Sequence, residues 1–430
     1  MSDKLKAAAP FILFTVFLDM LSIGVIIPVL PHLIEGFVGS VSAAGMWAGI
    51  FGSAWGMAQF IFSPIQGGLS DSIGRRPVVL ASNLGLGLDY MLMALAPNLW
   101  WLFAGRIISG ITSASISTAY AYISDVTPPE KRAGMFGMMG AAFGIGFVVG
   151  PSLGGILGGG LHFAWLADHG LGFLQFDGDK HYPFFFASAL SVLNFIYGFF
   201  VLPESLPKDK RKPFNIRAAN PLGAFRFLAR SAQVLRLSVM YLLMMFSQNV
   251  FPTTTVLYCA YRFGWGPTQV GLMLAVVGVC SAVVQAGLTG IIVKALGERK
   301  TMFLGLICGV LAFVGYGLAP TWPLFVACIP LGALWGLATP NIQALMSSKV
   351  DPKEQGTLQG ANMSLSAMST IFAPLIFGAT LAFVTRPQIS MWLSGAAFLV
   401  AAAFMVLSVV LATGVKQSLK VAPIYKTDPA

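Results

Sequence analysis

The chain has 430 residues, of which 56% are hydrophobic and only 10% are charged. A soluble domain carries about 25% charged residues, so this composition excludes a soluble protein whose whole surface faces water. The net charge of +10 would by itself suit nucleic acid or another acidic partner. Apolar stretches of roughly 20 residues instead match a helix that spans a hydrocarbon core about 30 Å thick.

Twelve membrane-spanning helices are predicted in chain order. They lie at residues 9–33, 43–65, 78–96, 99–123, 134–157, 183–202, 235–258, 268–292, 301–319, 323–346, 357–383 and 389–412. The first is too long for the apolar part of a signal peptide, and no small-residue cleavage site is evident, so we expect it to be retained. The expected fold class is therefore an all-α membrane protein.

The basic residues lie almost entirely on one side of these spans. Of the 26 Lys and Arg, 22 fall on that side, while only Lys180, Arg262 and Arg386 fall on the other and Arg106 lies within the fourth span. Lys and Arg accumulate on the cytoplasmic side of membrane proteins, so both termini are predicted to be cytoplasmic. The positive charge follows from this topology, and we expect no nucleic-acid partner.

A short charged hinge, GGLSDSIGRR at residues 67–76, separates the second and third spans. A weaker copy, GIIVKALGER at residues 290–299, recurs 223 residues later between the eighth and ninth spans. A repeat that covers half the chain is typical of transporters built from two similar bundles. We therefore predict two pseudo-symmetric six-helix bundles, at residues 1–203 and 234–430 (the second with a cytoplasmic tail), joined by a cytoplasmic linker at 204–233.

The hinge combines glycines with charges in a way that predicts a conformational latch. Its glycines allow a tight turn, Asp71 suits a helix N-terminus, and its arginines are expected to pair with the acid beyond the fourth span. The latch residues are Gly67, Asp71, Gly74, Arg75, Arg76 and Asp125. A loop that serves only to set topology is the alternative.

Three charged residues lie well inside predicted spans, namely Asp19, Asp89 and Arg106, whereas Arg236 lies at a span edge. A charge at mid-membrane costs roughly 2.5–3.5 kcal/mol on insertion scales, so such residues are functional by default. Burial raises a carboxyl pKa and a nearby arginine lowers it, so either acid is a candidate proton carrier. A static Asp–Arg pair that joins helices is the alternative.

The fifth span carries a glycine-rich stretch with a proline, GFVVGPSLGG at residues 146–155. Small residues every four positions allow close helix packing, and proline removes one helical hydrogen bond. The residues singled out are Gly146, Gly150, Pro151, Gly154 and Gly155. A generic packing face is the alternative.

Together these motifs resemble the major facilitator superfamily over essentially the whole chain. Residues 146–155 are similar to the antiporter motif of the drug:proton antiporters, and residues 18–31 to the first helix of the tetracycline-efflux group. The resemblance implies a twelve-helix transporter driven by protons. In tetracycline exporters the second half also contributes an intramembrane His and Asp, but this chain has Ser281 and Gly309 at those positions. Coupling is then expected to rest on Asp19, Asp89 and Arg106.

Amide side chains in the spans are candidates for a substrate cavity: Gln59, Gln248, Asn249, Gln285, Asn341 and Gln343. Each has an alternative as a hydrogen-bond partner between helices. The loop at 158–182 holds His162, His169 and His181, but their spacing matches no metal-ligand pattern, so neither a metal nor a cofactor is expected.

These features predict a transporter, not an enzyme, that acts as a monomer in a bacterial inner membrane. We expect it to exchange protons for a lipophilic or amphipathic small molecule by alternating access. Two alternatives remain open: a proton-coupled importer of a nutrient or metabolite, and a membrane sensor that does not transport.

Overall fold

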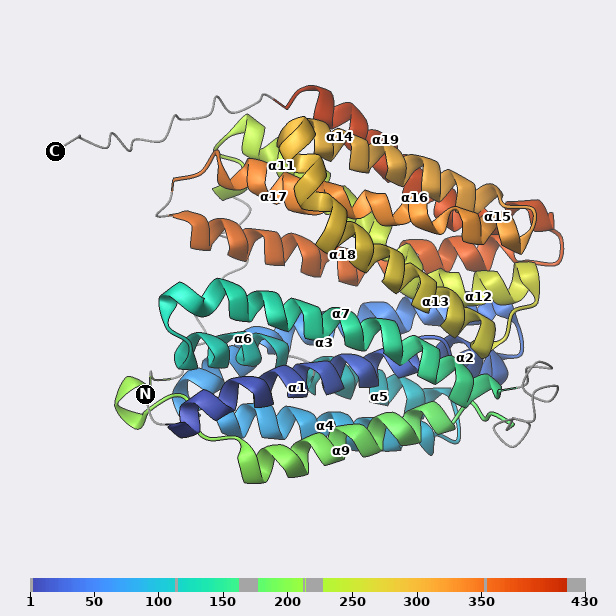
Figure 1. Cartoon of the computed structure of the whole chain (residues 1–430). Coiled ribbons are helices and arrows are strands. Elements are labelled where there is room, and N and C mark those ends of the chain that lie inside the picture. The colour runs from blue at the N-terminus through green and yellow to red at the C-terminus, as the bar shows by residue number, and fades with distance from the viewer. Residues whose placement is uncertain are drawn as a thin grey trace, which may run out of the picture.

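The computed structural model describes residues 3–112, 115–161, 177–211, 213, 227–351 and 354–415. Its secondary-structure elements are helices, arranged in two groups that lie side by side (Figure 1). The first group comprises α1 (Asp3–Ile26), α2 (Leu30–Val38), α3 (Val41–Ile73), α4 (Arg75–Ala94), α5 (Leu99–Thr112), α6 (Ser115–Val126), α7 (Pro129–Gly159) and α9 (Tyr182–Val201). A short 3-10 helix, η2 (Lys208–Lys210), follows it.

The second group is more often interrupted. It comprises α11 (Ala232–Gln248), α12 (Val250–Phe263), α13 (Pro267–Ala282), the π-helical turn η4 (Val283–Leu288), α14 (Thr289–Leu318), α15 (Trp322–Ala327), α16 (Ile329–Leu334), the 3-10 turn η5 (Trp335–Leu337), α17 (Ala338–Ser347), α18 (Gln355–Val384), the 3-10 turn η7 (Met391–Gly395) and α19 (Ala396–Thr413).

The expected twelve spans are confirmed in this arrangement. Within the described part of the chain, nine helical stretches are long and apolar enough to cross a membrane. One of them, Pro267–Leu318, is divided into two spans by a kink at Gly297. The other spans are α3, which is 33 residues long, and α5 followed by α6.

The two copies of the charged hinge share an unusual backbone. Gly74 has φ 114° and ψ 161°, and Gly297, 223 residues later, has φ 76° and ψ 162°. Positive φ is strained for residues with a Cβ, so both turns require glycine. By contrast, a Cβ at Gly67 or at its counterpart Gly290 would meet nothing within 4 Å. No neighbouring helix therefore approaches Gly67 closely, although its spacing matches the motif.

The two ends of the helix groups differ in how the groups touch each other. We call the end with Gly74 and Gly297 the hinge end, and the opposite end, which includes residues 177–181, the far end (left and right in Figure 1). Toward the far end, α3 packs against α18 and α7 packs against α13. Toward the hinge end, added Cβ atoms at Gly140 and Gly144 of α7 and at Gly360 of α18 would meet nothing within 4 Å.

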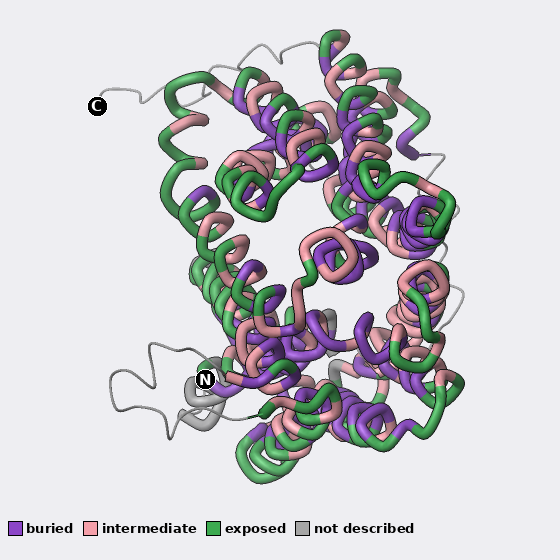
Figure 2. Tube along the Cα trace, turned by 90° about the vertical axis from the view of Figure 1, so that its right-hand side faces the viewer, coloured by how far each residue is buried: buried purple, intermediate pink, exposed green. Residues whose placement is uncertain are grey.

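Large apolar side chains are found both inside the groups and on their outer surface. Figure 2, which looks from the far end, shows buried residues toward the interior and many exposed ones at the periphery. Exposed examples include Phe200 at 80% and Ile291 at 66%, while Trp100 and Trp392 are exposed where helices begin at the far end. A bilayer covers such apolar surface, and tryptophans favour its interfaces.

Candidate functional site

The three predicted mid-span charges gather around one buried tyrosine in the first helix group. Tyr90 is only 1% exposed and lies close enough to Asp19, Asp89 and Arg106 to interact electrostatically with each. The acids come from α1 and α4 and the arginine from α5, so three helices contribute. Charges in a low-dielectric interior influence one another more strongly than in water. We call these four residues the charged cluster, and within it Asp89 and Arg106 also interact with each other.

Asp19 is 4% exposed and is held by α9. The Asn194 amide donates to Asp19 Oδ1 at 3.2 Å and accepts from the Thr15 hydroxyl at 3.2 Å. Asn194 is completely buried, so its hydrogen bonds decide where the Asp19 carboxyl lies. Asn194 was not predicted from the sequence. Its amide, within a sixth span of aromatic, aliphatic and small residues, was the available signal.

Asp89 and Arg106 lie on the neighbouring helices α4 and α5. A Cβ added at Gly105 would stand 2.9 Å from Asp89 Oδ1, so this glycine lets the carboxyl approach the backbone of α5. The Arg106 guanidinium lies 5.5 Å from the centre of the Trp55 ring on α3, a cation–π distance. Arg106 thus lies over an aromatic face and interacts electrostatically with the Asp89 carboxyl.

At the hinge end, Arg75 is the centre of an ion cluster. Its guanidinium lies 2.6 Å from Asp71 Oδ1 and 3.2 Å from Asp125 Oδ2, and it donates to the Ser70 hydroxyl at 2.6 Å. Ser205, beyond α9, also donates to Asp125 at 3.1 Å. The cluster joins α3, α4, α6 and the start of the linker within the first helix group, and it is formed while the hinge ends of the groups are apart.

Two expectations for the hinge are wrong. Arg76 does not pair with Asp125, because its guanidinium donates to the Phe199 carbonyl at 2.6 Å and lies 5.8 Å from that ring. The acid at the N-terminus of α4 is Glu204 rather than Asp71. Its carboxylate accepts from the backbone N–H groups of Arg75 at 2.8 Å and Arg76 at 3.3 Å, which satisfies two free donors. No spacing in the sequence connects Glu204 with the hinge.

Arg75→Gln should slow turnover more than Asp71→Asn, and neither change should abolish substrate affinity. Arg75 is 11% exposed and has three partners, whereas Asp71 is 47% exposed and contributes a weaker surface pair. Leaving the partners of Arg75 unpaired should cost about 1–3 kcal/mol. Initial rates and KM in proteoliposomes measure both effects, with Ser72→Ala, which changes an uncharged hinge residue, as control. Parental rates in both charge variants would leave the hinge with a purely topological role.

The glycine-rich stretch of α7 has two packing faces. Gly146, Gly150 and Gly154 face α1, where added Cβ atoms at Gly146 and Gly150 would come within 2.8 Å of Phe17 O and Leu21 O. These contacts lie inside the first helix group. Gly150 therefore packs inside the first group and not against the second.

The other face of α7 meets the second group. A Cβ added at Gly155 would stand 2.5 Å from Pro267 O and 2.9 Å from Gly271 Cα on α13, and one at Gly271 would meet the Pro151 carbonyl. Thr268 donates to Gly155 O at 3.2 Å. Gly155 and Pro151, with α13, thus form one seal between the groups at the far end.

The second seal joins α3 and α18. A Cβ added at Gly49 would stand 2.5 Å from Pro374 O, and one at Gly56 would stand 2.8 Å from Thr370 O. Ser53 donates to Ile371 O and Ser42 to Ala382 O, each at 2.6 Å. Backbone-to-backbone packing of this kind needs small residues on the facing helix. These residues were not predicted from the sequence, although Gly45, Gly49, Ser53 and Gly56 recur every three or four positions along one face of α3.

The six predicted cavity amides divide by environment. Asn341 is 3% exposed and donates to Leu337 O, and Asn249 donates to Met245 O and to Ser369 on α18, so both stabilise the second group internally. Gln59 and Gln343 are half-buried, whereas Gln248 and Gln285 are exposed. The two exposed amides lie at the break after α11 and in the π-helical turn η4. Such irregularities are frequent at functional sites.

The second helix group offers little room for a further titratable residue. A Cβ at Gly309 would come within 2.6 Å of Met405 Cε and 2.9 Å of Trp335 Cδ1, so a carboxylate there would displace packed side chains. No cluster of three or more potential metal ligands occurs among the residues that the structure describes. His162 and His169 lie outside those residues.

Sequence comparisons place the chain among transporters. The profile of the Major Facilitator Superfamily matches residues 12–374. The tetracycline resistance protein, class C, of Escherichia coli is 38% identical over 93% of this chain and 95% of its own length. The class H protein of Pasteurella multocida is 34% identical (90% and 91%), and multidrug resistance protein 2 of Bacillus subtilis (strain 168) is 26% identical (87% and 89%).

Solved structures show the same fold. The human organic anion transporter MFSD10 aligns over 96% of this chain and 100% of its own with a TM-score of 0.66 and 24% identity. A bacterial homologue of the human lysosomal transporter Spinster, in an inward-facing and unoccupied conformation, aligns over 96% and 97% with a TM-score of 0.74 and 16% identity.

Proposed function

The chain belongs to the Major Facilitator Superfamily, and we propose that it is a proton-coupled antiporter that exports lipophilic or amphipathic small molecules by alternating access. The observation that carries this proposal is the seal at the far end, where α7 meets α13 and α3 meets α18 through glycines. Alternating access requires two helix groups that rock against each other around a central site. Contacts between glycines involve no interdigitated side chains, so the helices can separate without repacking. This seal is therefore suited to reversible opening.

We further propose that the hinge end faces the cytoplasm of a bacterial cell. The basic residues at this end include Arg75, Arg132, Arg230, Arg299 and Lys349, against Lys180, Arg262 and Arg386 at the far end. This asymmetry follows the positive-inside rule. Under this orientation both termini are cytoplasmic, the structure is inward-facing, and residues 204–233 tether two bundles in a monomer.

The charged cluster around Tyr90 is the proposed coupling site. Asp19 is buried, accepts a hydrogen bond from Asn194 and interacts electrostatically with Tyr90, and a carboxyl in such surroundings can bind and release protons as they change. Ser281 and Gly309 offer no carboxylate or imidazole in the second group. Coupling would therefore depend on the first group alone.

The proposed substrate carries little charge. The exposed amides Gln248 and Gln285 can hydrogen-bond a polar edge, and a sugar phosphate would require several arginines or lysines instead. Several relatives bear the name tetracycline resistance protein, so tetracycline belongs in the test panel beside lipophilic dyes.

Cells that express the protein should accumulate less of a transported dye or drug than cells with an empty vector. Dissipation of the proton gradient with an ionophore should erase this difference, and Asp19→Asn should do the same at equal expression. Fluorescence of a panel of lipophilic compounds, with tetracycline included, measures accumulation. Higher accumulation in expressing cells would establish import, and an unchanged level across the panel would favour a non-transporting role.

A further inference from the structure

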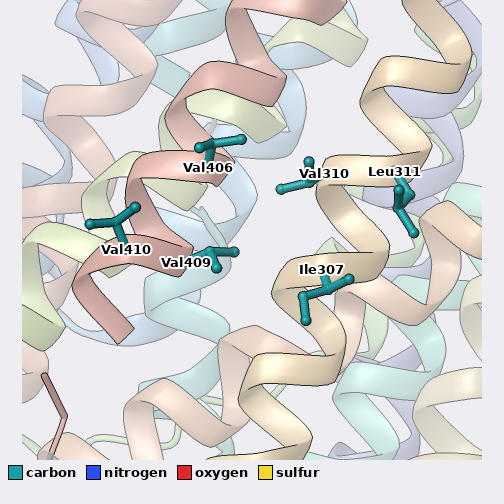
Figure 3. Close-up of a pocket in the computed structure, with 6 residues that line it drawn as sticks. All are labelled: Ile307, Val310, Leu311, Val406, Val409 and Val410. Carbon is teal, nitrogen blue, oxygen red and sulfur yellow. The ribbon is translucent and has the colours of Figure 1, made fainter. Parts of the chain in front are cut away.

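A groove without polar side chains runs between α14 and α19 on the membrane-facing surface of the second helix group. Ile307, Val310 and Leu311 line one wall and Val406, Val409 and Val410 the other (Figure 3). A second hollow lies on α14 nearer the hinge end, lined by Leu296, Arg299, Lys300 and Phe303. The first hollow is purely apolar and the second carries two positive charges.

The two hollows follow one stripe of α14. Residues 300, 303, 307 and 310 are three or four positions apart, so their side chains follow one another along the same helix face. From Lys300 to Leu311 the helix rises about 16 Å at 1.5 Å per residue. That length is close to half of a hydrocarbon core about 30 Å thick. The stripe therefore matches the depth of one membrane leaflet.

Arg299 is held in place at the hinge end of the stripe. Its Nη2 donates to the Thr413 carbonyl at the end of α19 at 3.3 Å, and its guanidinium lies 5.9 Å from the Phe303 ring. Its Nε is buried and has no hydrogen-bond partner among the residues described. Lys300 beside it is exposed, and the nearest acid on α14 is Glu298. The stripe thus ends in a guanidinium held by Thr413 and an exposed ammonium group beside it.

We propose that this stripe binds one anionic phospholipid, with its phosphate at Arg299 and Lys300 and an acyl chain in the valine-lined groove. Guanidinium and ammonium groups bind phosphate oxygens through charge-assisted hydrogen bonds. Basic pockets between membrane helices on the cytoplasmic side are suited to anionic headgroups. A zwitterionic lipid carries its own ammonium group, which two protein cations repel. The assignment of this lipid to the cytoplasmic leaflet rests on the orientation proposed above, whereas the binding itself does not.

Native mass spectrometry of the purified full-length protein tests this site. Equal amounts of phosphatidylglycerol and phosphatidylcholine with identical acyl chains compete for retention. We expect the parent protein to retain phosphatidylglycerol preferentially. Arg299→Gln combined with Lys300→Gln should reduce this preference by about 25-fold, roughly fivefold for each cation. Lys294→Gln, on the same helix but outside both hollows, is the matched control and should keep the parental preference.

Val310→Trp fills the groove while leaving both cations in place. We expect it to lower phosphatidylglycerol retention without altering the hinge end, and it decides the matter if the charge variant fails to fold. Equal retention of the two lipids by the parent would overturn the proposal. So would parental retention in Val310→Trp, or a loss in Lys294→Gln as large as that in the double variant, because surface charge alone would then account for binding.

Discussion

Asp19→Asn should abolish transport driven by a proton gradient while leaving exchange of substrate across the membrane measurable. The buried Asp19 carboxyl accepts a hydrogen bond from Asn194 and interacts electrostatically with Tyr90. An amide of the same shape can keep the hydrogen bond from neighbouring groups but cannot bind or release a proton. Inverted vesicles give both readouts, with labelled substrate taken up after acidification of the lumen or exchanged against internal substrate without a gradient.

Two further variants separate proton binding from packing. Thr15→Ala keeps the carboxyl and removes only the hydroxyl that donates to Asn194, so gradient-driven uptake should fall modestly. Asp89→Asn tests whether the second acid shares the proton. If Asp19→Asn retains full gradient-driven uptake, Asp19 is a structural residue and the coupling site lies elsewhere.

The fold followed from the sequence because span length and charge bias are local properties. We could identify the twelve apolar stretches, the side of the membrane that carries most Lys and Arg, and the repeated hinge without knowing which residues touch in the fold. The repeat also predicted that Gly74 and Gly297 play equivalent roles, and both have the same positive-φ backbone. Gly67 shows the limit of this reasoning, since its spacing matched the motif but its surroundings are empty.

The contacts of the candidate site depend on which helices become neighbours, and sequence spacing does not determine that. Glu204 reaches the start of α4 from beyond α9, and Asn194 reaches Asp19 from the sixth span. The α7 motif was recognised, but the assignment of Gly150 to one partner helix and Gly155 to another requires the angle at which the helices cross. Asn341 likewise is indistinguishable in sequence from an amide that faces a cavity.

Gly155→Leu should trap the transporter with its far end open and remove most of its turnover. A Cβ at this position would already stand 2.5 Å from Pro267 O, and the rest of leucine has no space against α13. Overpacking costs about 1–3 kcal/mol. Because the proposed cycle separates α7 from α13 when the far end opens, this cost falls on the closed state alone. The equilibrium between the two states should then shift by about 5–150-fold.

A reporter cysteine in place of Gln248 measures this shift in a background without the four native cysteines. Gln248 is exposed at the break between α11 and α12, and under its proposed role in the central cavity we expect an impermeant maleimide supplied from the far end to reach it only when the seal opens. Labelling should rise in Gly155→Leu but not in Gly144→Leu, where the added Cβ meets nothing within 4 Å. Gly154→Leu should instead lower thermal stability, because it collides with Val25 inside the first group. Parental labelling and turnover in Gly155→Leu would show that the contact between α7 and α13 is not a gate, since a seal that tolerates leucine does not control opening.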